Sequence, residues 1–421
     1  MLLTQSALNK TNNRIIFVSA RSIATAQQEA ENNSRLTFIF DKFVNIPFNK
    51  IFLTGKETNY IREAVNAGKI SGDGVFTKKC HRFFEERYGF SKTLITTSCT
   101  DALEMSAILL NIQEGDEVIA PSYTFVSTVN PFVLRGARIV FADSHALNPN
   151  IDAELIEPLI SNRTKAIVVV HYAGIACDMD KIMALAQKHK LAVVEDAAQA
   201  IDSFHNGIPL GRIGTFGTFS FHETKSISSG EGGLLAINDK KYISRAEIIW
   251  EKGTNRASFF RGEVDKYGWV DIGSSFLPSD MIAAYLLAQL ENLDEIQTKR
   301  KELWKKYYTL LSPLSDQGLV RLPFIPEYAS NNAHMFYLVM SNLQHRTELM
   351  TQLKSKGIHT VFHYLSLHKS PYYSKRHLGK ELPHADRYTD CLLRLPMYGD
   401  LKTSEVDSIC EYILQFFAHR K

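Results

Sequence analysis

Residues 220–225 of this 421-residue chain read Ser-Phe-His-Glu-Thr-Lys, and residues 230–233 read Gly-Glu-Gly-Gly. Lys225 therefore follows a run typical of a buried strand, and the later glycines permit unusual backbone angles close to a ligand. Earlier in the chain, residues 193–199 read Val-Val-Glu-Asp-Ala-Ala-Gln, so the carboxylate of Asp196 ends a second apolar run. Alone, Lys225 is most simply a solvated surface residue, and Asp196 has a helix N-cap as its alternative role. Together they indicate a reaction site.

This pair of residue types is what pyridoxal 5'-phosphate chemistry requires. The amine of a lysine forms a Schiff base with the aldehyde of the cofactor, and a carboxylate keeps the pyridine nitrogen protonated, so that the ring accepts electrons from a carbanion. Because burial raises the pKa of a carboxylate, Asp196 needs a cationic partner to stay ionised, and a pyridinium supplies one. The sequence therefore predicts a pyridoxal-phosphate enzyme with Lys225 as the catalytic residue.

Two further segments could complete a cofactor site. Residues 96–101 read Thr-Thr-Ser-Cys-Thr-Asp and stand between a β-rich run and a helical one. Backbone N–H groups at a helix N-terminus, backed by hydroxyls such as those of Thr100 and Ser220, form an anion site suited to phosphate. By itself this signal is weak, because any capped helix looks similar. Residues 121–125, Pro-Ser-Tyr-Thr-Phe, place aromatic rings that could stack on a pyridine ring or equally belong to the core.

The composition is that of an ordinary globular protein, with 45% hydrophobic and 22% charged residues. A net charge of +3 without a long basic run gives no indication of nucleic acid as a partner. No apolar stretch reaches membrane-spanning length, so we expect no membrane insertion. The five cysteines are scattered without a Cys-x-x-Cys pair. This pattern argues against a disulfide framework or a metal site and favours a reducing, cytoplasmic location.

From residue 46 onward, short β-rich runs alternate with helical stretches. The alternation predicts an α/β fold with a mostly parallel sheet covered by helices, whose ligands gather at the carboxyl ends of the strands. We expect a large domain over residues 46–290 and a smaller C-terminal α/β domain over residues 291–421. The predicted strands are 93–96, 117–120, 138–141, 165–170, 191–194 and 215–221, and the predicted helices include 101–110, 153–160, 179–189 and a long one near 281–301.

Residues 1–45 do not fit this alternation. Their basic residues, and the absence of an acidic residue before Glu29, give them some likeness to a transit peptide. The apolar run at residues 15–18 is too short for a secretory signal. We therefore interpret the segment as a dispensable N-terminal extension, disordered or upstream of the true start, in preference to a targeting peptide.

The order of these segments resembles that of the DegT/DnrJ/EryC1/StrS family of sugar-nucleotide aminotransferases. The resemblance covers about residues 46–421 and rests on the segments at 98–100, 121–125, 196–199 and 220–225, the last with its Gly-Glu-Gly-Gly tail. It implies a pyridoxal-phosphate transferase of fold type I, the aspartate-aminotransferase type, acting as a homodimer with the active site at the subunit interface. The implied cofactor contacts are Lys225 as Schiff-base lysine and proton shuttle, Asp196 at the pyridine nitrogen, Gln199 and Phe125 at the ring, and Thr100, Asp101 and Ser220 at the phosphate.

Within the family, residues 253–275 are most similar to the subgroup of dTDP-4-amino-4,6-dideoxygalactose transaminases, which serve enterobacterial common antigen synthesis. The partners then implied are L-glutamate as amino donor and a dTDP-4-keto-6-deoxy sugar, dTDP-4-dehydro-6-deoxy-D-glucose, as acceptor. Many relatives carry Gly-Tyr-Asn-Tyr-Arg where residues 273–277 read Gly-Ser-Ser-Phe-Leu. Their asparagine reaches the cofactor phosphate of the partner subunit, so Ser275 is the shorter candidate for that contact. The expected substrate contacts are Tyr123, Arg256, and His363 and His368 in a segment similar to the family's closing substrate loop.

Other functions stay open at this point. These motifs do not clearly distinguish a 3-amino-sugar nucleotide transaminase from a 4-amino-sugar one. A pyridoxal-phosphate sugar dehydratase, a lyase, resembles this family but replaces the Schiff-base lysine with histidine, and Lys225 argues against it. A nicotinamide dehydrogenase would share the α/β alternation, but no Gly-x-Gly-x-x-Gly follows an early strand. A non-catalytic protein on the same fold is disfavoured by the intact pair of Lys225 and Asp196.

Overall fold

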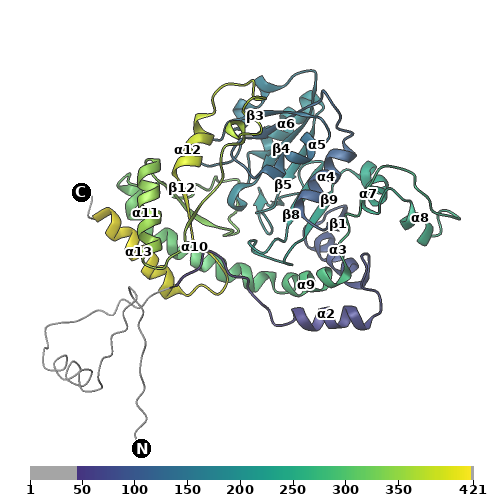
Figure 1. Cartoon of the computed structure of the whole chain (residues 1–421), viewed down its shortest axis with the longest axis horizontal. Helices are drawn as coiled ribbons and strands as arrows, with labels where there is room; N and C mark the ends of the chain where they lie inside the picture. The colour runs from purple at the N-terminus through teal and green to yellow at the C-terminus, as the bar shows by residue number, and fades with distance from the viewer. Residues whose placement is uncertain (1–44, 419–421) are drawn as a thin grey trace, which may run out of the picture. The chain divides into compact units, whose positions relative to one another are not determined.

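The central element is a seven-stranded sheet with the strand order β1-β9-β8-β5-β4-β2-β3 (Figure 1). The structure, a computed structural model, describes residues 45–418 of the chain. Neighbouring strands are parallel except where β9 pairs with β1 and β8, so the predicted mostly parallel sheet is confirmed. The strands are β1 (Lys92–Thr96), β2 (Glu117–Pro121), β3 (Arg138–Ala142), β4 (Thr164–Val170), β5 (Ala192–Asp196), β8 (Phe216–Ser220) and β9 (Gly233–Ile237).

The central strands are apolar because both faces of the sheet are covered. From Ala166 to Val170, every residue of β4 is buried, as expected for a parallel strand between two layers of helix. The register pairs Val170 of β4 with Asp196 of β5, and Asp196 with Thr218 of β8. These three strands therefore end close together, and the carboxylate of Asp196 lies at that edge.

Helices cover the sheet, and each face has its own core. One core packs the aromatic rings of Phe84 in α3 and Phe219 in β8 together with residues of α9. The other packs α6 against strand residues that include Ile167 and Val193. The helices around this sheet are α2 (Glu57–Asn66), α3 (Val75–Tyr88), α4 (Cys99–Leu109), α5 (Asn130–Leu134), α6 (Met179–His189), α7 (Ile243–Trp250), α8 (Arg256–Phe260) and α9 (Asp280–Leu290). No helix within residues 45–418 is long and apolar enough to cross a membrane.

The long helix predicted near residues 281–301 is divided in two, so that prediction is wrong. α9 ends at Leu290, and α10 (Leu293–Asp316) begins after a short break. At the break, the side chain of Asn292 donates a hydrogen bond to the carbonyl of Ala288 at 2.7 Å. This bond satisfies a carbonyl that the last turn of α9 would leave free, so a local side chain ends the helix.

The helix predicted over residues 153–160 is also wrong. The segment forms two short 3₁₀ turns, Ala153–Leu155 and Glu157–Leu159. Pro158 lacks the backbone N–H that a continuous α-helix needs, and its ring crowds the preceding turn. The other two predicted helices are confirmed as α4 and α6.

A second sheet of three antiparallel strands has the order β10-β12-β11. It lies within the predicted C-terminal domain, and the seven-stranded sheet lies within residues 46–290; the boundary near residue 290 stays a prediction. Ile46, at the start of the described chain, pairs with Ile358 beside this second sheet. The predicted extension lies, apart from Asn45, outside the described residues. The elements here are α10, β10 (Phe336–Val339), α11 (Leu343–Ser355), β11 (Val361–Phe362), α12 (Pro383–Cys391), β12 (Leu392–Leu395) and α13 (Thr403–Ala418), and a two-stranded hairpin, β6 (Phe204–His205) and β7 (Ile208–Pro209), follows β5.

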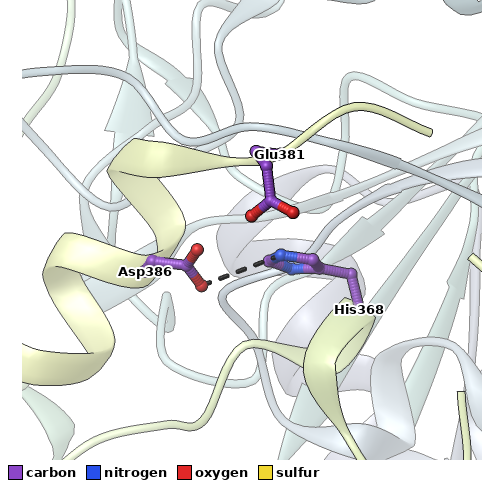
Figure 2. A group of neighbouring side chains, drawn as sticks. All are labelled: His368, Glu381 and Asp386. Carbon is purple, nitrogen blue, oxygen red and sulfur yellow. Dashed lines mark ion pairs between the residues drawn. The ribbon is translucent and has the colours of Figure 1, made fainter. Parts of the chain in front are cut away.

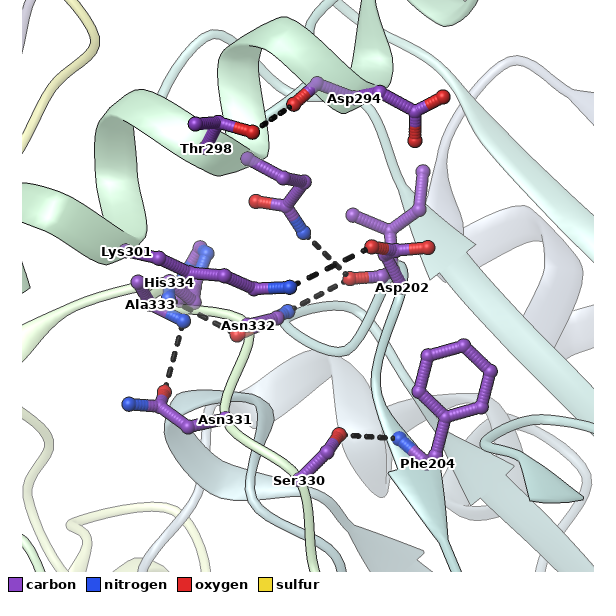
Figure 3. Close-up of polar contacts among 12 residues, drawn as sticks. Asp202, Phe204, Asp294, Thr298, Lys301, Ser330, Asn331, Asn332, Ala333 and His334 are labelled. Carbon is purple, nitrogen blue, oxygen red and sulfur yellow. Dashed lines mark hydrogen bonds and ion pairs between the residues drawn. The ribbon is translucent and has the colours of Figure 1, made fainter. Parts of the chain in front are cut away.

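A network of polar contacts fixes residues 330–334, which lead into β10 (Figure 3). The amide of Asn332 donates to the carbonyls of Gln199 (2.9 Å) and Ile201 (2.8 Å), and its Oδ1 accepts from the N–H of His334 (3.0 Å). Gly174, whose φ is +77°, lies so close that a Cβ there would collide with the side chain of Asn332. The loop after β5 and the segment before β10 are thus held together, and both contribute residues to the site described next.

Candidate active site

A cavity of about 890 Å³ lies at the carboxyl ends of β4, β5 and β8. Its wall combines residues of the large sheet with residues from the C-terminal part of the chain, among them Tyr364 and Arg394. This is the edge at which ligands of parallel sheets bind. The cavity brings together seven of the predicted site residues: Thr100, Phe125, Asp196, Gln199, Ser220, Lys225 and His363.

Asp196 is a buried carboxylate that the chain holds in place on one side. Its Oδ2 accepts a hydrogen bond from the hydroxyl of Thr128 at 2.8 Å, and its Oδ1 accepts from the N–H of Ala198 at 3.1 Å. Burial raises the pKa of Asp196, and these two hydrogen bonds oppose that rise. The carboxylate is therefore fixed in position, but its two hydrogen bonds do not fully offset the cost of burying its charge. A cation in the cavity would stabilise the charged form.

Lys225 stands in a turn between β8 and β9, with its N–H donating to the carbonyl of His222 at 2.9 Å. Its side chain lines the cavity and is half-buried. Burial lowers the pKa of the Lys225 amine, and the charge of Arg394 lowers it further, while Asp196 acts in the opposite direction. A lowered pKa favours the neutral amine, which is the form that attacks an aldehyde and removes a proton.

The N-terminus of α4 forms a cradle of N–H and hydroxyl groups. Ser98 caps the helix by accepting from the N–H of Asp101 at 3.1 Å, and Thr100 donates to the hydroxyl of Ser127 at 2.9 Å. A Cβ at Gly233 would collide with the backbone of Ser98, so glycine is needed for β9 to approach this turn. Ser220, which pairs with Gly233 in the sheet, adds a further hydroxyl to the cavity. This arrangement suits a phosphate group.

Asp101 lies beside this cradle but does not line the cavity. Its backbone N–H is bonded to Ser98, and its carboxylate accepts a hydrogen bond from the hydroxyl of Thr97. The contact implied for Asp101, through its backbone, stays a prediction.

Gln199, Phe125 and Tyr364 line another part of the cavity. The Oε1 of Gln199 accepts from the N–H of Ala173 at 2.6 Å, and its Nε2 donates to the hydroxyl of Tyr364 at 3.1 Å. The ring of Phe125, 55% exposed, lies 6.0 Å from that of Tyr364. Because its ring is free on one side, Phe125 is available to stack on a planar ligand.

His363 belongs to the same wall. Its Nδ1 lies 3.0 Å from the hydroxyl of Tyr172, and its ring packs on that of Tyr364. Burial holds the pKa of His363 well below its usual value, and the charge of Arg394 adds to this effect. The ring is therefore neutral and can accept or donate a hydrogen bond toward a substrate.

Three other predicted residues lie outside this cavity within the described chain. Tyr123 is 1% exposed and packs its ring among those of Tyr172, Tyr364 and Tyr388. Ser275 is exposed and pairs through its backbone with Glu251. Arg256 is exposed on α8, with its guanidinium 3.9 Å from Glu251. Neither Ser275 nor Arg256 lines this cavity within the described chain.

His368 also lies outside the cavity, in a cluster with Asp386 and Glu381 (Figure 2). Its Nδ1 lies 2.7 Å from the hydroxyl of Ser122, and its Nε2 lies 3.7 Å from Asp386. The ammonium of Lys369 pairs with both carboxylates, at 2.6 Å from Asp386 and 3.2 Å from Glu381. The chain therefore supplies this cluster with its own cation, and His368 fastens the loop that carries His363 to the end of β2.

The cavity contains residues that the sequence did not single out. Thr128 holds Asp196, and the Nδ1 of the buried His334 lies 3.2 Å from the hydroxyl of Ser226, next to Lys225. The most informative of them is Arg394 on β12. A single arginine between Leu393 and Leu395 in an apolar strand is the signal that could have indicated it.

These residues fit pyridoxal phosphate. The cradle at α4 suits the phosphate, the incompletely compensated carboxylate of Asp196 suits a protonated pyridine nitrogen, and the amine of Lys225 suits the aldehyde. The fold and this donor set define a pyridoxal-phosphate-dependent aminotransferase of fold type I.

Comparison with known proteins identifies the family. The family model of the DegT/DnrJ/EryC1/StrS aminotransferases matches residues 53–414, and the chain belongs to this family. It is 32% identical over 377 residues to the spore coat polysaccharide biosynthesis protein SpsC of Bacillus subtilis, covering 87% of this chain and 96% of that protein. The chain is thus a sugar aminotransferase, as the resemblance implied.

Solved structures show the same architecture. The aminotransferase TlmJ of Streptoalloteichus hindustanus superposes with a TM-score of 0.81 at 28% identity, covering 89% of this chain and 99% of that one. Spr1654 of Streptococcus pneumoniae in its PLP form gives a TM-score of 0.81 at 25% identity, covering 89% and 98%. The same protein has also been solved in its PMP form. The predicted cofactor and fold type are therefore confirmed.

Proposed function

We propose that this aminotransferase moves the amino group of L-glutamate to C4 of dTDP-4-dehydro-6-deoxy-D-glucose. The products would be dTDP-4-amino-4,6-dideoxy-D-galactose and 2-oxoglutarate, serving enterobacterial common antigen or a related surface polysaccharide. The observation that carries the transfer chemistry is the placement of Lys225 and Asp196 in one cavity, with the pKa of the amine lowered. The 4-keto sugar is supported by the resemblance of residues 253–275 to the dideoxygalactose subgroup. The similarity to SpsC, a protein of spore coat polysaccharide biosynthesis, agrees with a sugar acceptor.

In this proposal Lys225 moves the protons. When bound, pyridoxal phosphate supplies the aldehyde for Lys225 and a ring that accepts the electrons of a carbanion. The freed amine of Lys225 removes the α-proton of glutamate and later delivers a proton to C4 of the sugar. Asp196, held by Thr128, keeps the pyridine nitrogen protonated throughout. The amino group replaces the C4 keto oxygen, and glutamate leaves as 2-oxoglutarate.

The other residues position the reactants. The amide of Gln199 and the ring of Phe125 would orient the cofactor ring from its edge and its face. The hydroxyls of Thr100 and Ser220 would hold its phosphate. Neutral His363, next to Tyr364, would donate to or accept from a sugar hydroxyl. These assignments follow from the position of each side chain on the cavity wall.

We also propose that the enzyme acts as a homodimer in which residues 251–277 reach the second subunit. In Figure 1, α8 and the loop after it extend away from the large sheet. This segment exposes large apolar side chains, with Trp269 84% and Phe260 69% accessible, and exposed apolar groups of this size favour a protein contact. A dimer would bring Ser275 and Arg256 to the cavity of the partner subunit. Light scattering should give a dimer for the wild-type protein and a monomer of low activity for Trp269→Glu; a fully active wild-type monomer would contradict the assembly.

The experiment that tests the reaction is an absorbance titration of the purified protein with its cofactor. L-Glutamate should bleach the yellow absorbance of lysine-bound pyridoxal phosphate, and dTDP-4-dehydro-6-deoxy-D-glucose should restore it. Bleaching without recovery by this sugar, but with recovery by a 3-keto isomer, would favour a 3-amino-sugar transaminase. Absorbance that no amino acid bleaches, with loss of water from the sugar, would favour a dehydratase.

A further inference from the structure

Three side chains with metal-binding groups meet beside the start of α12, and none of them lines the active-site cavity. The imidazole of His368, in the short 3₁₀ turn Leu367–Lys369, faces the carboxylates of Glu381 and Asp386 (Figure 2). Each residue offers one ligand atom, and these three atoms lie within 4.8 Å of one another. An imidazole nitrogen with two carboxylate oxygens is a donor set suited to divalent ions such as Zn²⁺.

His368 brings to this group a nitrogen for which the described residues provide no hydrogen-bond partner. The residue is 3% exposed, and its Nε2 is buried. The Nε2 lies 3.7 Å from Oδ1 of Asp386, which is too long for a hydrogen bond. Two ligands of one tetrahedral Zn²⁺ ion, each about 2.1 Å from the metal, are roughly 3.4 Å apart. The spacing of His368 and Asp386 is therefore close to that of two ligands of one ion.

Ser122, which follows β2, holds the other nitrogen of the ring. Its hydroxyl lies 2.7 Å from Nδ1 of His368 and accepts from the backbone N–H of the same residue at 3.2 Å. When the hydroxyl also accepts the Nδ1 proton, the lone pair of Nε2 faces the two carboxylates. Metal-bound histidines usually make such a second hydrogen bond, because it fixes the tautomer and the orientation of the ring. Burial lowers the pKa of His368, which favours the neutral ring that a metal requires.

Lys369 is the cation that the chain itself places here, and a metal ion would have to displace it. Its ammonium lies 2.6 Å from Oδ2 of Asp386 and 3.2 Å from Oε2 of Glu381. The side chain of Lys369 is 54% exposed and that of Glu381 82%, so their ion pair is hydrated and contributes little free energy. A divalent ion carries twice the charge and also uses the nitrogen of His368. Lys369 therefore competes with a metal ion but leaves that nitrogen without a partner.

We propose that His368, Glu381 and Asp386 bind a divalent transition-metal ion, which fastens the loop before His368 to α12. This loop carries His363 and Tyr364, which line the active-site cavity. Glu381 and Asp386 lie just before and within α12. An ion bound by all three residues therefore restrains one wall of the cavity from outside. Mg²⁺ should bind less well than Zn²⁺, because it prefers a shell of oxygen ligands and water.

The test is a calorimetric titration of the holoenzyme, without an affinity tag and after treatment with a chelator, with Zn²⁺ and separately with Mg²⁺. Wild type should bind Zn²⁺ at least about 10-fold more tightly than Mg²⁺. His368→Gln removes a ligand and should weaken Zn²⁺ binding at least about 10-fold. Lys369→Gln removes the competing ammonium and should tighten it roughly 3- to 10-fold. Absence of Zn²⁺ binding to wild type, or equal binding to wild type and His368→Gln, would overturn the proposal.

Two further variants make this comparison independent of folding and of unrelated zinc binding. Glu381→Gln alters an exposed side chain, so it should fold as wild type does and still weaken Zn²⁺ binding. His345→Gln, on α11 and outside the group, is the matched control and should bind Zn²⁺ like wild type. Equal weakening in His345→Gln, or unchanged binding in Glu381→Gln, would contradict the assigned ligands.

Hydrogen exchange tests the effect of the ion on the loop. Zn²⁺ should slow amide exchange at residues 363–369 of the wild-type holoenzyme and leave exchange in His368→Gln unchanged. Zinc binding without this protection would overturn the proposed restraint of the loop. Neither the titration nor the exchange measurement uses an amino donor or a sugar. Their failure is therefore distinct from a failure of the proposed reaction.

Discussion

Arg300 is a buried arginine and Arg394 a partly buried one, and the two differ in their hydrogen-bond partners. Arg300, on α10, donates to the carbonyls of Ala333 (3.1 Å), His334 (2.5 Å) and Met397 (3.4 Å). Burial lowers its pKa to about 10. The guanidinium of Arg394 lies 4.6 Å from the centre of the Phe48 ring, and its Nε has no hydrogen-bond partner among the described residues. A buried charged group that is hydrogen-bonded by the chain stabilises the fold. A charged group without such partners in the chain is available to a ligand.

Two neighbouring residues of β5 show the same contrast between carboxylates. Glu195 is fully buried, and its oxygens accept from the N–H groups of Gly211 (2.7 Å), Ile213 (2.8 Å) and Gly214 (2.5 Å). The Nε2 of His171 lies 2.9 Å from it as well. Asp196, one residue later, points to the other face of the strand and keeps part of its carboxylate for the cavity. Substitution of Glu195, whose hydrogen bonds are made by the chain, should therefore change stability. Substitution of Asp196, which faces the cavity, should change activity.

Lys225→Ala should show the largest effect, and it falls on activity alone. Removing both the nucleophile and the proton carrier should lower turnover by at least about 10⁴-fold. The phosphate cradle and Asp196 remain, so the variant should still bind pyridoxal phosphate noncovalently, without the yellow lysine-bound absorbance. Steady-state turnover and an absorbance spectrum after gel filtration measure the two parts. Substantial activity in this variant would remove Lys225 from the mechanism.

Glu195→Gln should show the largest loss of stability. The amide keeps the shape of the side chain but places an NH₂ group against backbone N–H donors, leaving buried donors unpaired. The free energy of unfolding should fall by about 2–4 kcal/mol. Urea denaturation of the cofactor-free protein measures this loss. Glu302→Gln, a change on the exposed side of α10, serves as the control and should leave stability unchanged. Equal stability of the two variants would refute the contrast on β5.

Ser122→Ala tests the fastening of the C-terminal loop and should have an intermediate effect. The hydroxyl of Ser122 contacts His368 through both its ring and its N–H. Its removal should destabilise the protein by about 1–2 kcal/mol and loosen the loop that carries His363 and Tyr364. The KM for the sugar should then rise more than kcat falls. A change in kcat alone would mean that Ser122 acts on the chemistry and not on the loop.

Asp196→Asn should have the smallest effect on stability, and of the opposite sign. Burial raises the pKa of Asp196 in the folded state, so the folded protein holds a proton there more tightly than the unfolded chain does. Stability of the cofactor-free protein therefore falls as pH rises from the usual aspartate pKa through the raised one. Asparagine removes this dependence, so the variant without cofactor should be more stable than wild type at neutral pH while losing most of its activity. Melting temperatures between pH 4 and 8, compared with and without pyridoxal phosphate, measure both; a less stable variant at neutral pH would contradict the assignment.

The sequence predicted the strands well where burial on two faces demanded an apolar run. β4 and β5 are such runs, and each was predicted to within one residue of its start. The break between α9 and α10 was missed because it depends on one side-chain bond, from Asn292 to Ala288, inside a continuous helical pattern. The segment around Pro158 differs from the predicted helix because the proline removes an N–H that a continuous helix needs.

For the site, residue order along the chain was enough to choose Lys225 and Asp196, because this chemistry needs one amine and one carboxylate at the ends of adjacent strands. Which side chains lie close together in the folded protein could not be predicted from residue order in the same way. Tyr123 and His368 carry the right functional groups but lie in packed surroundings outside the cavity, and only the arrangement of β2 against the C-terminal loop shows this.

By itself, then, the sequence determined the class of fold and the cofactor, because these depend on local patterns and on residue types. It also predicted Lys225 and Asp196 as the reacting pair, and both line the same cavity. The tertiary structure alone decided which buried charges are complete. The chain around Arg300 and Arg394 does not show whether either has hydrogen-bond partners, since the groups around them, Ala333, His334, Met397 and Phe48, come from distant segments. A buried charge becomes a binding site only where the folded chain leaves it without hydrogen-bond partners of its own.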